Sequence, residues 1–484
     1  MRLDDSPLAS ARDDCEVAES RRSLRERIAI TADQEATLCR LLLLLIAVCL
    51  AGCNSSESPQ TVTVPNPNSP LNAVPASEIR IVVSGDTRGW IMPCGCTANQ
   101  SGGLLRRATY VQQLKNQSDV VVADCGGAAE GTAPYQQSRF RAILLGEKQM
   151  GLQAHNVGAS EAALGAETLK RLATETGVAF ISANITTNDG QPIVQTHRLL
   201  EQSGQRLLIT GVCSPSLLGD SGLYASAPGD AILAVLKQRA AQFDRVIVLA
   251  WLPVDELRQL AETLPEADVI VGGPTGQSLP PETIGRVLLT SATNKGKFIA
   301  CLKFPASVQD DVSAEIVELS PTYADDETQK SNLDAFREML GQRDFTAAES
   351  GFAPSDSVGS PSSAQVAGTE SCRECHTEAC TGWDSTPHAH AWERLVTQKS
   401  AVDPYCQQCH TTGYGLAGGF VSMKESIART NVGCESCHGP SADHVKDNKH
   451  RTPVDAIGAC LRCHDHENSP HFEFAGYWEK IRHE

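Results

Sequence analysis

Apolar and polar positions follow two different periods between residues 79 and 319 of this 484-residue chain. Short apolar runs predict strands at residues 79–84, 119–123, 178–183, 245–251 and 267–272. Segments with the 3.6-residue period of helices lie between them, at residues 104–115, 139–151, 161–174, 231–242 and 255–262. Strands that alternate with helices are typical of an α/β domain with a mainly parallel sheet. Residues 285–319 predict antiparallel strands that close the sheet.

The N-terminal segment has the pattern of an export signal. Arginines at positions 21, 22, 25, 27 and 40 precede an apolar run at residues 41–51, about half a membrane span in length. The run ends in Leu50-Ala51-Gly52-Cys53, which resembles a bacterial lipobox and implies a lipid-modified Cys53 as the mature N-terminus. Residues 1–20 are net acidic, which departs from an ordinary signal peptide. The alternative is a short hydrophobic core segment.

Two stretches of small and polar residues separate the parts of the chain. Residues 54–76 are rich in Ser, Pro and Asn, and residues 347–368 in Ser, Gly, Ala and Pro. A short helix is predicted at residues 331–340. The predicted organisation is a lipoprotein signal peptide, a flexible tether, the α/β domain, a linker with a short helix, and a second domain, at residues 1–52, 53–78, 79–322, 323–368 and 369–484.

Four CxxCH motifs fall in the second domain. Two cysteines three residues apart can form thioethers to the two vinyl groups of one porphyrin, and the adjacent histidine reaches the iron. The motifs predict four covalent haems c, attached through Cys372, Cys375 and His376; Cys406, Cys409 and His410; Cys434, Cys437 and His438; and Cys460, Cys463 and His464. Zinc sites or disulfides are the alternative, but neither demands a histidine after every pair. Haem attachment outside the cytoplasmic membrane agrees with an export signal.

The formal net charge of −17 excludes some partners. It argues against nucleic acid and against an electrostatic hold on anionic lipid, so membrane association should come from the lipid anchor. Acidic surfaces suit docking to basic redox proteins, and the expected partners are redox proteins or quinol-linked electron donors.

The order of strands and helices, with Gly85-Asp86-Thr87-Arg88-Gly89 after the first strand, resembles the calcineurin-like metallophosphatase and 5′-nucleotidase fold. That family holds two metal ions at the strand ends, and of its ligands Asp86 remains here. Residues that cannot replace the other ligands stand at their positions: Arg88, Gly126-Gly127, Gly158-Ala159-Ser160, Trp251 and Gly272-Gly273-Pro274-Thr275-Gly276. The resemblance implies an α/β sandwich, and the lost ligands predict that it has no phosphatase activity.

Three cysteines are predicted at the same edge, namely Cys94, Cys96 and Cys125. A disulfide from Cys94 or Cys96 to Cys125 is one interpretation in an exported protein. A thiolate site for zinc or copper, with Asp86 nearby, is the other.

Residues 370–484 resemble the tetrahaem cytochrome c-554 family beyond the four motifs. The resemblance is carried by Gly382-Trp383-Asp384-Ser385 with His388, by Thr411-Thr412-Gly413-Tyr414, by residues 431–440, and by Tyr477-Trp478-Glu479-Lys480-Ile481. It implies a compact, mainly α-helical domain in which packed haems replace much of the side-chain core. The family pattern makes His388, His444 and His483 the expected sixth ligands and leaves the haem on Cys406 and Cys409 five-coordinate, unless His390 or His450 fills that site.

The expected protein is therefore two-domain, with an α/β metallophosphatase-like sandwich followed by a mainly α, haem-packed multihaem cytochrome c domain. Its expected function is electron transfer by an exported, lipid-anchored protein of the periplasm or cell envelope. One alternative is a haem-based oxidoreductase that reduces small nitrogen compounds at an open iron. Another is a protein whose α/β domain binds a ligand or partner and couples it to the haems.

Overall fold

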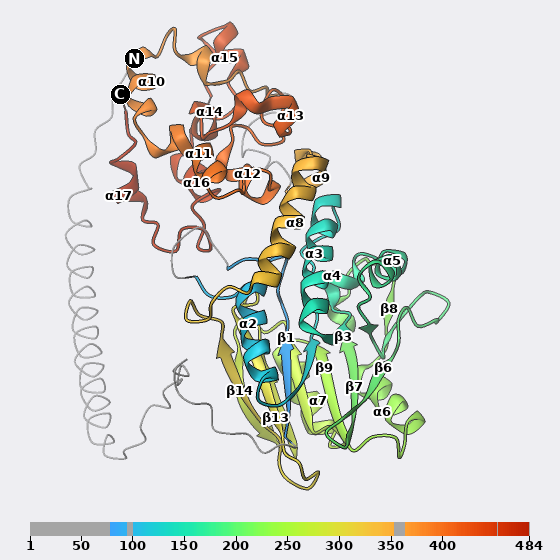
Figure 1. Cartoon of the computed structure of the whole chain (residues 1–484). Coiled ribbons are helices and arrows are strands. Elements are labelled where there is room, and N and C mark those ends of the chain that lie inside the picture. Colours follow the sequence, from blue (N-terminus) through green and yellow to red (C-terminus); the bar gives the residue numbers. More distant parts are fainter. Residues whose placement is uncertain (1–77, 94–99, 353–363, 453, 484) are drawn as a thin grey trace, which may run out of the picture. The chain divides into compact units, whose positions relative to one another are not determined.

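The computed structural model describes residues 78–93, 100–352, 364–452 and 454–483. All of them belong to one compact unit, Pro65–Glu484 (Figure 1). The predicted signal peptide, Cys53, Cys94 and Cys96 lie outside the described residues. Among the helices that are described, none has the length and apolar character needed to cross a membrane.

The α/β region contains two six-stranded mixed sheets. The first has the order β14-β13-β1-β2-β3-β4, with parallel pairing from β1 to β4 and antiparallel pairing of β13 and β14. Its strands are β1 (Ile79–Ser84), β2 (Asp119–Asp124), β3 (Leu152–Asn156), β4 (Phe180–Ile181), β13 (Phe298–Phe304) and β14 (Ser313–Glu318). Because β1, β2 and β3 run parallel, the loops after them meet at one edge of the sheet.

The second sheet has the order β11-β12-β10-β9-β7-β6 and is parallel from β12 to β7. Its strands are β6 (His197–Gln202), β7 (Gln205–Cys213), β9 (Arg245–Trp251), β10 (Val269–Gly273), β11 (Leu279–Ile284) and β12 (Val287–Ser291). A separate pair joins β5 (Ile185–Thr186) and β8 (Tyr224–Ala225). The inner faces of the two sheets share a fully apolar core that includes Ile81, Leu207 and Leu249.

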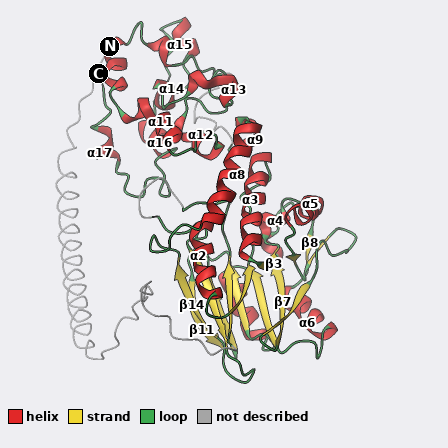
Figure 2. Cartoon of the chain, viewed as in Figure 1, coloured by secondary structure: helices red, strands yellow, loops and turns green. Residues whose placement is uncertain are grey.

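Helices cover the outer face of each sheet, as expected for parallel strands that are apolar on both sides (Figure 2). The first sheet is covered by α2 (Leu104–Lys115), α3 (Pro134–Met150), α5 (Ala166–Thr176) and α8 (Glu327–Arg343). The second is covered by α6 (Pro228–Gln238) and α7 (Val254–Thr263). Two short helices, α4 (Ala159–Ala162) and η1 (Pro215–Leu217), lie in loops. The predicted α/β sandwich is confirmed.

Several element predictions were incomplete. β3, β6 and β7 were missed, and the single helix predicted at residues 161–174 is two helices, α4 and α5, separated at Gly165 with its φ of 79°. The helix predicted inside the linker is longer than expected. It is α8, which packs against α2 and α3 through Leu333, Phe336 and Leu340, so it forms part of the outer layer of the sandwich.

The region with the four CxxCH motifs is built from short helices, and its described residues form no strand. After α9 (Ala347–Ser350), which precedes this region, its α-helices are α10 (Thr377–Asp384), α11 (Ala391–Thr397), α12 (Pro404–His410), α13 (Met423–Ser426), α14 (Cys434–His438), α15 (Ala442–Lys446), α16 (Ala456–Leu461) and α17 (Phe474–Trp478). Tighter turns lie at η2 (Thr369–Cys372), η3 (Pro387–His390) and η4 (Ile427–Arg429). Hereafter residues 364–483 are called the haem-motif region.

Candidate functional site

Each CxxCH motif is wound into about one helical turn. In the first and fourth motifs the histidine amide donates to the carbonyl of the first cysteine, at 2.9 Å for His376 and Cys372 and 2.8 Å for His464 and Cys460. The second and third motifs lie in α12 and α14. A helical turn brings residues i, i+3 and i+4 to one side, so both cysteines and the histidine can meet one porphyrin.

Three pairs of histidine rings face each other in the haem-motif region. The ring centroids are 6.2 Å apart for His376 and His444. They are 6.1 Å apart for His388 and His464 and 5.8 Å apart for His438 and His483. Metal–imidazole bonds of about 2 Å on each side would separate two opposed ring centroids by about 6 Å. Each pair thus has the spacing for one metal ion between its rings.

The histidine hydrogen bonds leave Nε2 available as the ligand atom. Nδ1 of His410 donates to the Ala391 carbonyl at 2.7 Å, and Nδ1 of His444 donates to the His450 carbonyl at 2.7 Å. Nδ1 of His483 donates to the Ile481 carbonyl at 3.0 Å. A carbonyl acceptor fixes the tautomer in which Nε2 carries the lone pair, which is the arrangement common for metal-binding histidines.

Burial also favours the neutral form of the facing rings. It lowers the pKa values of three of these imidazoles, His388, His438 and His464, and also that of His410. A neutral imidazole is the form that binds a metal. The donor set, the ring spacing and the protonation preference all fit axial ligation of haem.

His410 differs from the other three motif histidines. The three ring pairs in the described part of the chain do not include it. The alternative ligand His390 is engaged elsewhere, with Nε2 3.0 Å from the Asp384 carbonyl and Nδ1 3.3 Å from Glu393. His450 is 68% exposed and lies near Asp447.

The helix that carries His410 is held by the α/β region. Asp403, the N-cap of α12, accepts a 2.5 Å hydrogen bond from the Tyr135 hydroxyl of α3. Tyr405 on α12 packs edge-to-face on Trp90 at 5.2 Å and under the Arg139 guanidinium at 4.8 Å. These side chains position the second motif from outside its own region, and no local sequence signal pointed to them.

Glu435, inside the third motif, is a second residue that sequence reasoning missed. Its side chain is buried and its carboxylate accepts from the backbone amides of Ala367 at 2.9 Å, Gly368 at 2.6 Å and Ser441 at 2.7 Å. A buried carboxylate that satisfies three amides pins the segment before the first motif to the third motif.

The edge of the sandwich where the family resemblance places metals has been rebuilt around Trp251. A Cβ added at Gly127 would lie 2.1 Å from the Trp251 indole, and one added at Gly158 would lie 3.0 Å from it. Gly273 borders the same ring, at 3.2 Å. The indole therefore occupies the space that side chains at these positions would need. The small residues at these positions and the large indole of Trp251 therefore pack as one unit.

Asp86 remains but has a different role. Its carboxylate accepts from Arg88 Nε at 2.6 Å through Oδ1 and from the Thr293 hydroxyl at 2.5 Å through Oδ2. Asp86 is 3% exposed, and both Asp86 and Arg88 have positive φ angles, of 53° and 46°. The surviving carboxylate thus orients an arginine in a turn that non-glycine residues rarely adopt.

Of the three cysteines predicted at this edge, Cys125 is the one among the described residues. Its thiol donates to the Val271 carbonyl at 3.2 Å, and the side chain lies in the core between the sheets. Burial raises the pKa of this thiol well above its ordinary value, which disfavours a thiolate. Cys125 is unpaired. Its expected partners in both interpretations, Cys94 and Cys96, lie outside the described residues, so the disulfide and the metal-thiolate site stay predictions.

A buried ionisable cluster lies behind this edge, made of Asp124, Glu147 and His155 with Arg107 and Glu161 around them. His155 Nδ1 is 3.1 Å from Glu147, and Arg107 is 3.2 Å from the same carboxylate. Burial acts to lower the pKa of His155, but Asp124 and Glu147 raise it well above its ordinary value. Burial and the Glu147 charge raise the pKa of Asp124 to about 7. The three groups form a compensated ion network inside the sandwich.

Comparison with known proteins agrees with the two halves of this description. Residues 371–439 match the family described as "Cytochrome c554 and c-prime". Cytochrome c-554 of Nitrosomonas europaea is 34% identical over 97 residues, covering 17% of this chain and 41% of that protein. The haem-motif region is a cytochrome c554-like domain. The family match implies covalent haem c in this region, and the chain spans less than half the length of that cytochrome.

The α/β region shares the fold of a 5′-nucleotidase precursor of known structure. A 5′-nucleotidase precursor from Thermus thermophilus aligns with a TM-score of 0.50 at 20% identity, covering 55% of this chain and 59% of that one. The calcineurin-like phosphoesterase YfkN from Bacillus subtilis aligns with a TM-score of 0.49 at 15% identity, covering 55% of this chain and 98% of that one. The predicted resemblance of the α/β region is confirmed at the level of fold, and that of the haem-motif region by the family match over residues 371–439.

Proposed function

We propose that the protein is an exported tetrahaem c-type cytochrome that transfers electrons in the periplasm or cell envelope, tethered to a membrane through a lipid on Cys53. The observation that carries this proposal is the set of three facing imidazole pairs beside four CxxCH motifs. The export signal and the lipobox-like sequence before Cys53 support the location.

In this proposal each motif binds one haem and three haems have two axial histidines. The ligand pairs are His376 with His444, His388 with His464, and His438 with His483. His410 would bind the fourth iron, and the three ring pairs among the described residues offer it no second histidine. Bound haem supplies reversible one-electron chemistry, and two imidazoles favour simple electron transfer because they leave no open coordination position.

The residues around the irons hold the imidazoles in place. The Ala391 and His450 carbonyls accept from Nδ1 of His410 and His444, which fixes the ring orientation and leaves Nε2 directed to the iron. Glu435 ties the first and third motifs together. Fixed ligands reduce the rearrangement that accompanies a change of oxidation state.

The α/β domain is proposed to have no phosphatase or nucleotidase activity. Trp251 occupies the space of the lost ligands, and Asp86 is already paired with Arg88 and Thr293. One paired carboxylate cannot hold two divalent ions at the separation that phosphoryl transfer requires.

The proposed partners are redox proteins or quinol-linked electron donors, with membrane contact through the lipid and without nucleic acid. The net charge of −17 favours basic docking surfaces on a protein partner and repels nucleic acid.

A second candidate function is a haem-based oxidoreductase acting on a small nitrogen compound. The observation that favours it is the absence of His410 from the three ring pairs in the described residues. An iron with one protein ligand can bind such a molecule. This function and electron transfer are compatible, because the other three centres would then deliver electrons to the fourth.

Intact-mass measurement of membrane-extracted protein tests the main proposal. The expected mass is that of the chain from Cys53 with added lipid and four haems. Cys53→Ala should release the protein from the membrane without changing its haem content. A mass equal to the unmodified chain, or a Cys53→Ala variant that stays in the membrane fraction, would contradict it.

A further inference from the structure

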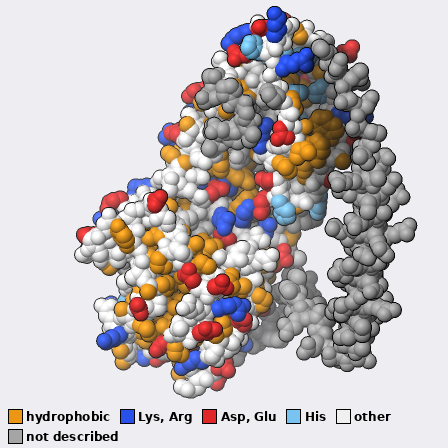
Figure 3. All heavy atoms as spheres, turned by 180° about the vertical axis from the view of Figure 1, so that it is seen from behind, with side chains coloured by type: hydrophobic (Ala, Val, Ile, Leu, Met, Phe, Trp, Pro, Cys, Tyr) orange, Lys and Arg blue, Asp and Glu red, His pale blue; other side chains and the backbone are white. Residues whose placement is uncertain are grey.

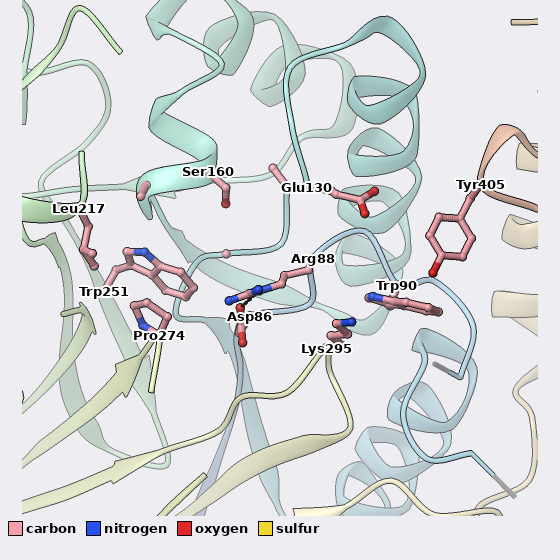
Figure 4. A pocket seen from close by; sticks show the side chains of 13 residues that line it. Asp86, Arg88, Trp90, Glu130, Ser160, Leu217, Trp251, Pro274, Lys295 and Tyr405 are labelled. Carbon is pink, nitrogen blue, oxygen red and sulfur yellow. Dashed lines mark hydrogen bonds and ion pairs between the residues drawn. The ribbon is translucent and has the colours of Figure 1, made fainter. Parts of the chain in front are cut away.

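The edge of the α/β region around Trp251, with Tyr405 of the haem-motif region, borders an open cavity of about 470 Å³. This volume lies in the range of small-molecule binding sites. Its lining has three parts, visible in Figure 4: an apolar end, a cationic middle, and an aromatic end. The site does not depend on the proposed electron transfer, since its walls come mainly from the α/β region.

The apolar end is formed by Trp251, Leu217 and Pro274 (Figure 4). Trp251 is 5% exposed and is wedged against Gly127, Gly158 and Gly273. A side chain packed on three glycines has little room to turn, so the indole presents a fixed apolar surface. Such a surface suits a flat or compact apolar group.

The middle of the cavity lining carries Arg88, and the buried Asp86 carboxylate sets the orientation of its side chain. Asp86 accepts from its Nε, and the buried Asp86 carboxylate is itself held by Thr293. A guanidinium has five N–H donors, and this contact uses the one on Nε. The side chain is 53% exposed, and the guanidinium lies in the cavity between Trp251 and Lys295 (Figure 4). Its terminal nitrogens are thus presented to a ligand as a preoriented pair.

The charges in and around the cavity are nearly balanced. Arg88 pairs with Asp86, Lys295 pairs with Glu467 at 3.1 Å, and the lining residue Glu130 pairs with Arg139 at 3.0 Å. A site with balanced charges disfavours ligands that carry several negative charges, because the carboxylates of Asp86 and Glu130 would repel them. It can accept a single negative charge at the open face of Arg88.

We propose that this cavity binds a small organic monocarboxylate, with the carboxylate on the terminal nitrogens of Arg88 and the apolar body against Trp251. Two parallel N–H···O bonds match the shape of a carboxylate. The aromatic end adds Trp90 and Tyr405, and Tyr405 immediately precedes Cys406. A bound ligand therefore lies beside the helix that carries the second haem motif.

Calorimetric titration of the full-length holoprotein tests this site at constant ionic strength. The probes are acetate, hexanoate and benzoate, with benzamide as the neutral counterpart of benzoate. Benzoate and hexanoate should bind more tightly than acetate, and benzamide should bind at least tenfold more weakly than benzoate. Equal binding of benzoate and benzamide, or no binding of any of the three carboxylates at millimolar concentration, would overturn the proposal.

Two variants and a control locate the binding. Arg88→Gln should weaken benzoate binding at least tenfold, whereas Arg141→Gln, an exposed arginine of α3 that pairs with Glu175, should leave it unchanged. Leu217→Trp keeps Arg88 and fills the apolar end, so it should abolish hexanoate and benzoate binding while sparing acetate. Chemical denaturation of each variant reports whether the α/β region is intact. Wild-type affinity in both Arg88→Gln and Leu217→Trp would place the ligand elsewhere.

Discussion

The α/β region and the haem-motif region differ in what fills their interiors. In the α/β region the central strands are buried on both faces, and side chains such as Ile81, Leu207 and Leu249 are 0% exposed. The haem-motif region has few large buried apolar residues, among them Leu395, Tyr414 and Phe420. Its helices are also shorter, at four to eight residues.

The haem-motif region instead leaves many large apolar side chains exposed on the protein surface. They are Val396, Ile427, Val445, Val454, Ile457, Leu461, Tyr477 and Trp478, each at least 38% exposed. Figure 3 shows apolar side chains and histidines at the surface of this region. The α/β region thus has an apolar core made of its own side chains. The haem-motif region has few buried apolar side chains, as expected of a fold whose interior is filled by porphyrin. The difference yields separate predictions for each region.

The largest expected effect is loss of structure when haem cannot be attached. Replacing Cys434 and Cys437 by serine should remove one haem and make residues 364–483 sensitive to proteolysis, because short helices with few buried side chains cannot hold the fold. The α/β region should stay protected. Limited proteolysis with mass mapping distinguishes the two regions. Equal protease resistance with and without that haem would show that the side-chain core suffices.

A core substitution in the sandwich should have the opposite pattern. Leu249→Ala, at 0% exposure in β9, should lower the free energy of unfolding of the α/β region by about 2–5 kcal/mol, because it creates a cavity. All haems should stay attached. Leu233→Ala is the matched control, since Leu233 is 41% exposed on α6 and should change stability by less than about 1 kcal/mol. Chemical denaturation measures both, and equal effects would refute the description of the core.

The buried ion network should make the α/β region less stable as pH rises. The pKa of Asp124 is raised to about 7 from 3.8, and that of His155 is also raised, so the folded state holds protons that the unfolded state releases. Between the unfolded-state and the folded-state pKa of each group, the release of its proton on unfolding lowers the unfolding free energy by about 1.4 kcal/mol for each unit of rising pH. For Asp124 the window runs from about pH 4 to about pH 7, and for His155 it begins near pH 6.5 and extends upward.

Hydrogen exchange of the β2 amides, followed from about pH 5 to about pH 8 and corrected for intrinsic rates, checks this slope. Asp124→Asn should flatten it below pH 7. Asp244→Asn should leave it unchanged, because Arg206 holds the pKa of that carboxyl at about 2, outside the window. Stability that is constant or rises with pH in the wild type would show that the network is not protonated as described.

The smallest expected effect concerns the contact between the two regions. Tyr135→Phe removes the 2.5 Å hydrogen bond to Asp403 and should cost about 1–2 kcal/mol of local stability. Hydrogen exchange of α12 should accelerate while that of α14 does not. Tyr224→Phe, at 60% exposure, is the control and should change neither helix. Unchanged exchange in α12 would mean that α3 does not position the second motif.

The periodicity of the sequence predicted the sandwich better than it predicted the haem-motif region. The bounds of β1 and α2 follow from uninterrupted apolar patterns. β7 was missed although its residues are almost all buried and it forms a hairpin with β6 through the turn at Ser203 and Gly204. The haem-motif region was recognisable through its CxxCH spacing, because helices of four to eight residues have too few turns to show a period.

The sequence likewise predicted some residues of the candidate sites and not others. Motif spacing alone indicates the cysteines and proximal histidines, but the facing partners of those histidines are distant along the chain, as in His388 with His464. The expected set of His388, His444 and His483 came from family resemblance. Contacts between distant segments, such as Tyr135 with Asp403, have no local sequence signal.

The spin states of the irons test the central claim most directly. Electron paramagnetic resonance of the oxidised holoprotein should show three low-spin irons and one high-spin iron that responds to cyanide or nitric oxide. Replacing His388, His444 or His483 with alanine should each convert one further iron to high spin, with all four haems still attached. A wholly low-spin wild-type spectrum, or three variants whose spectra do not change, would contradict the ligand pairs proposed from the facing rings.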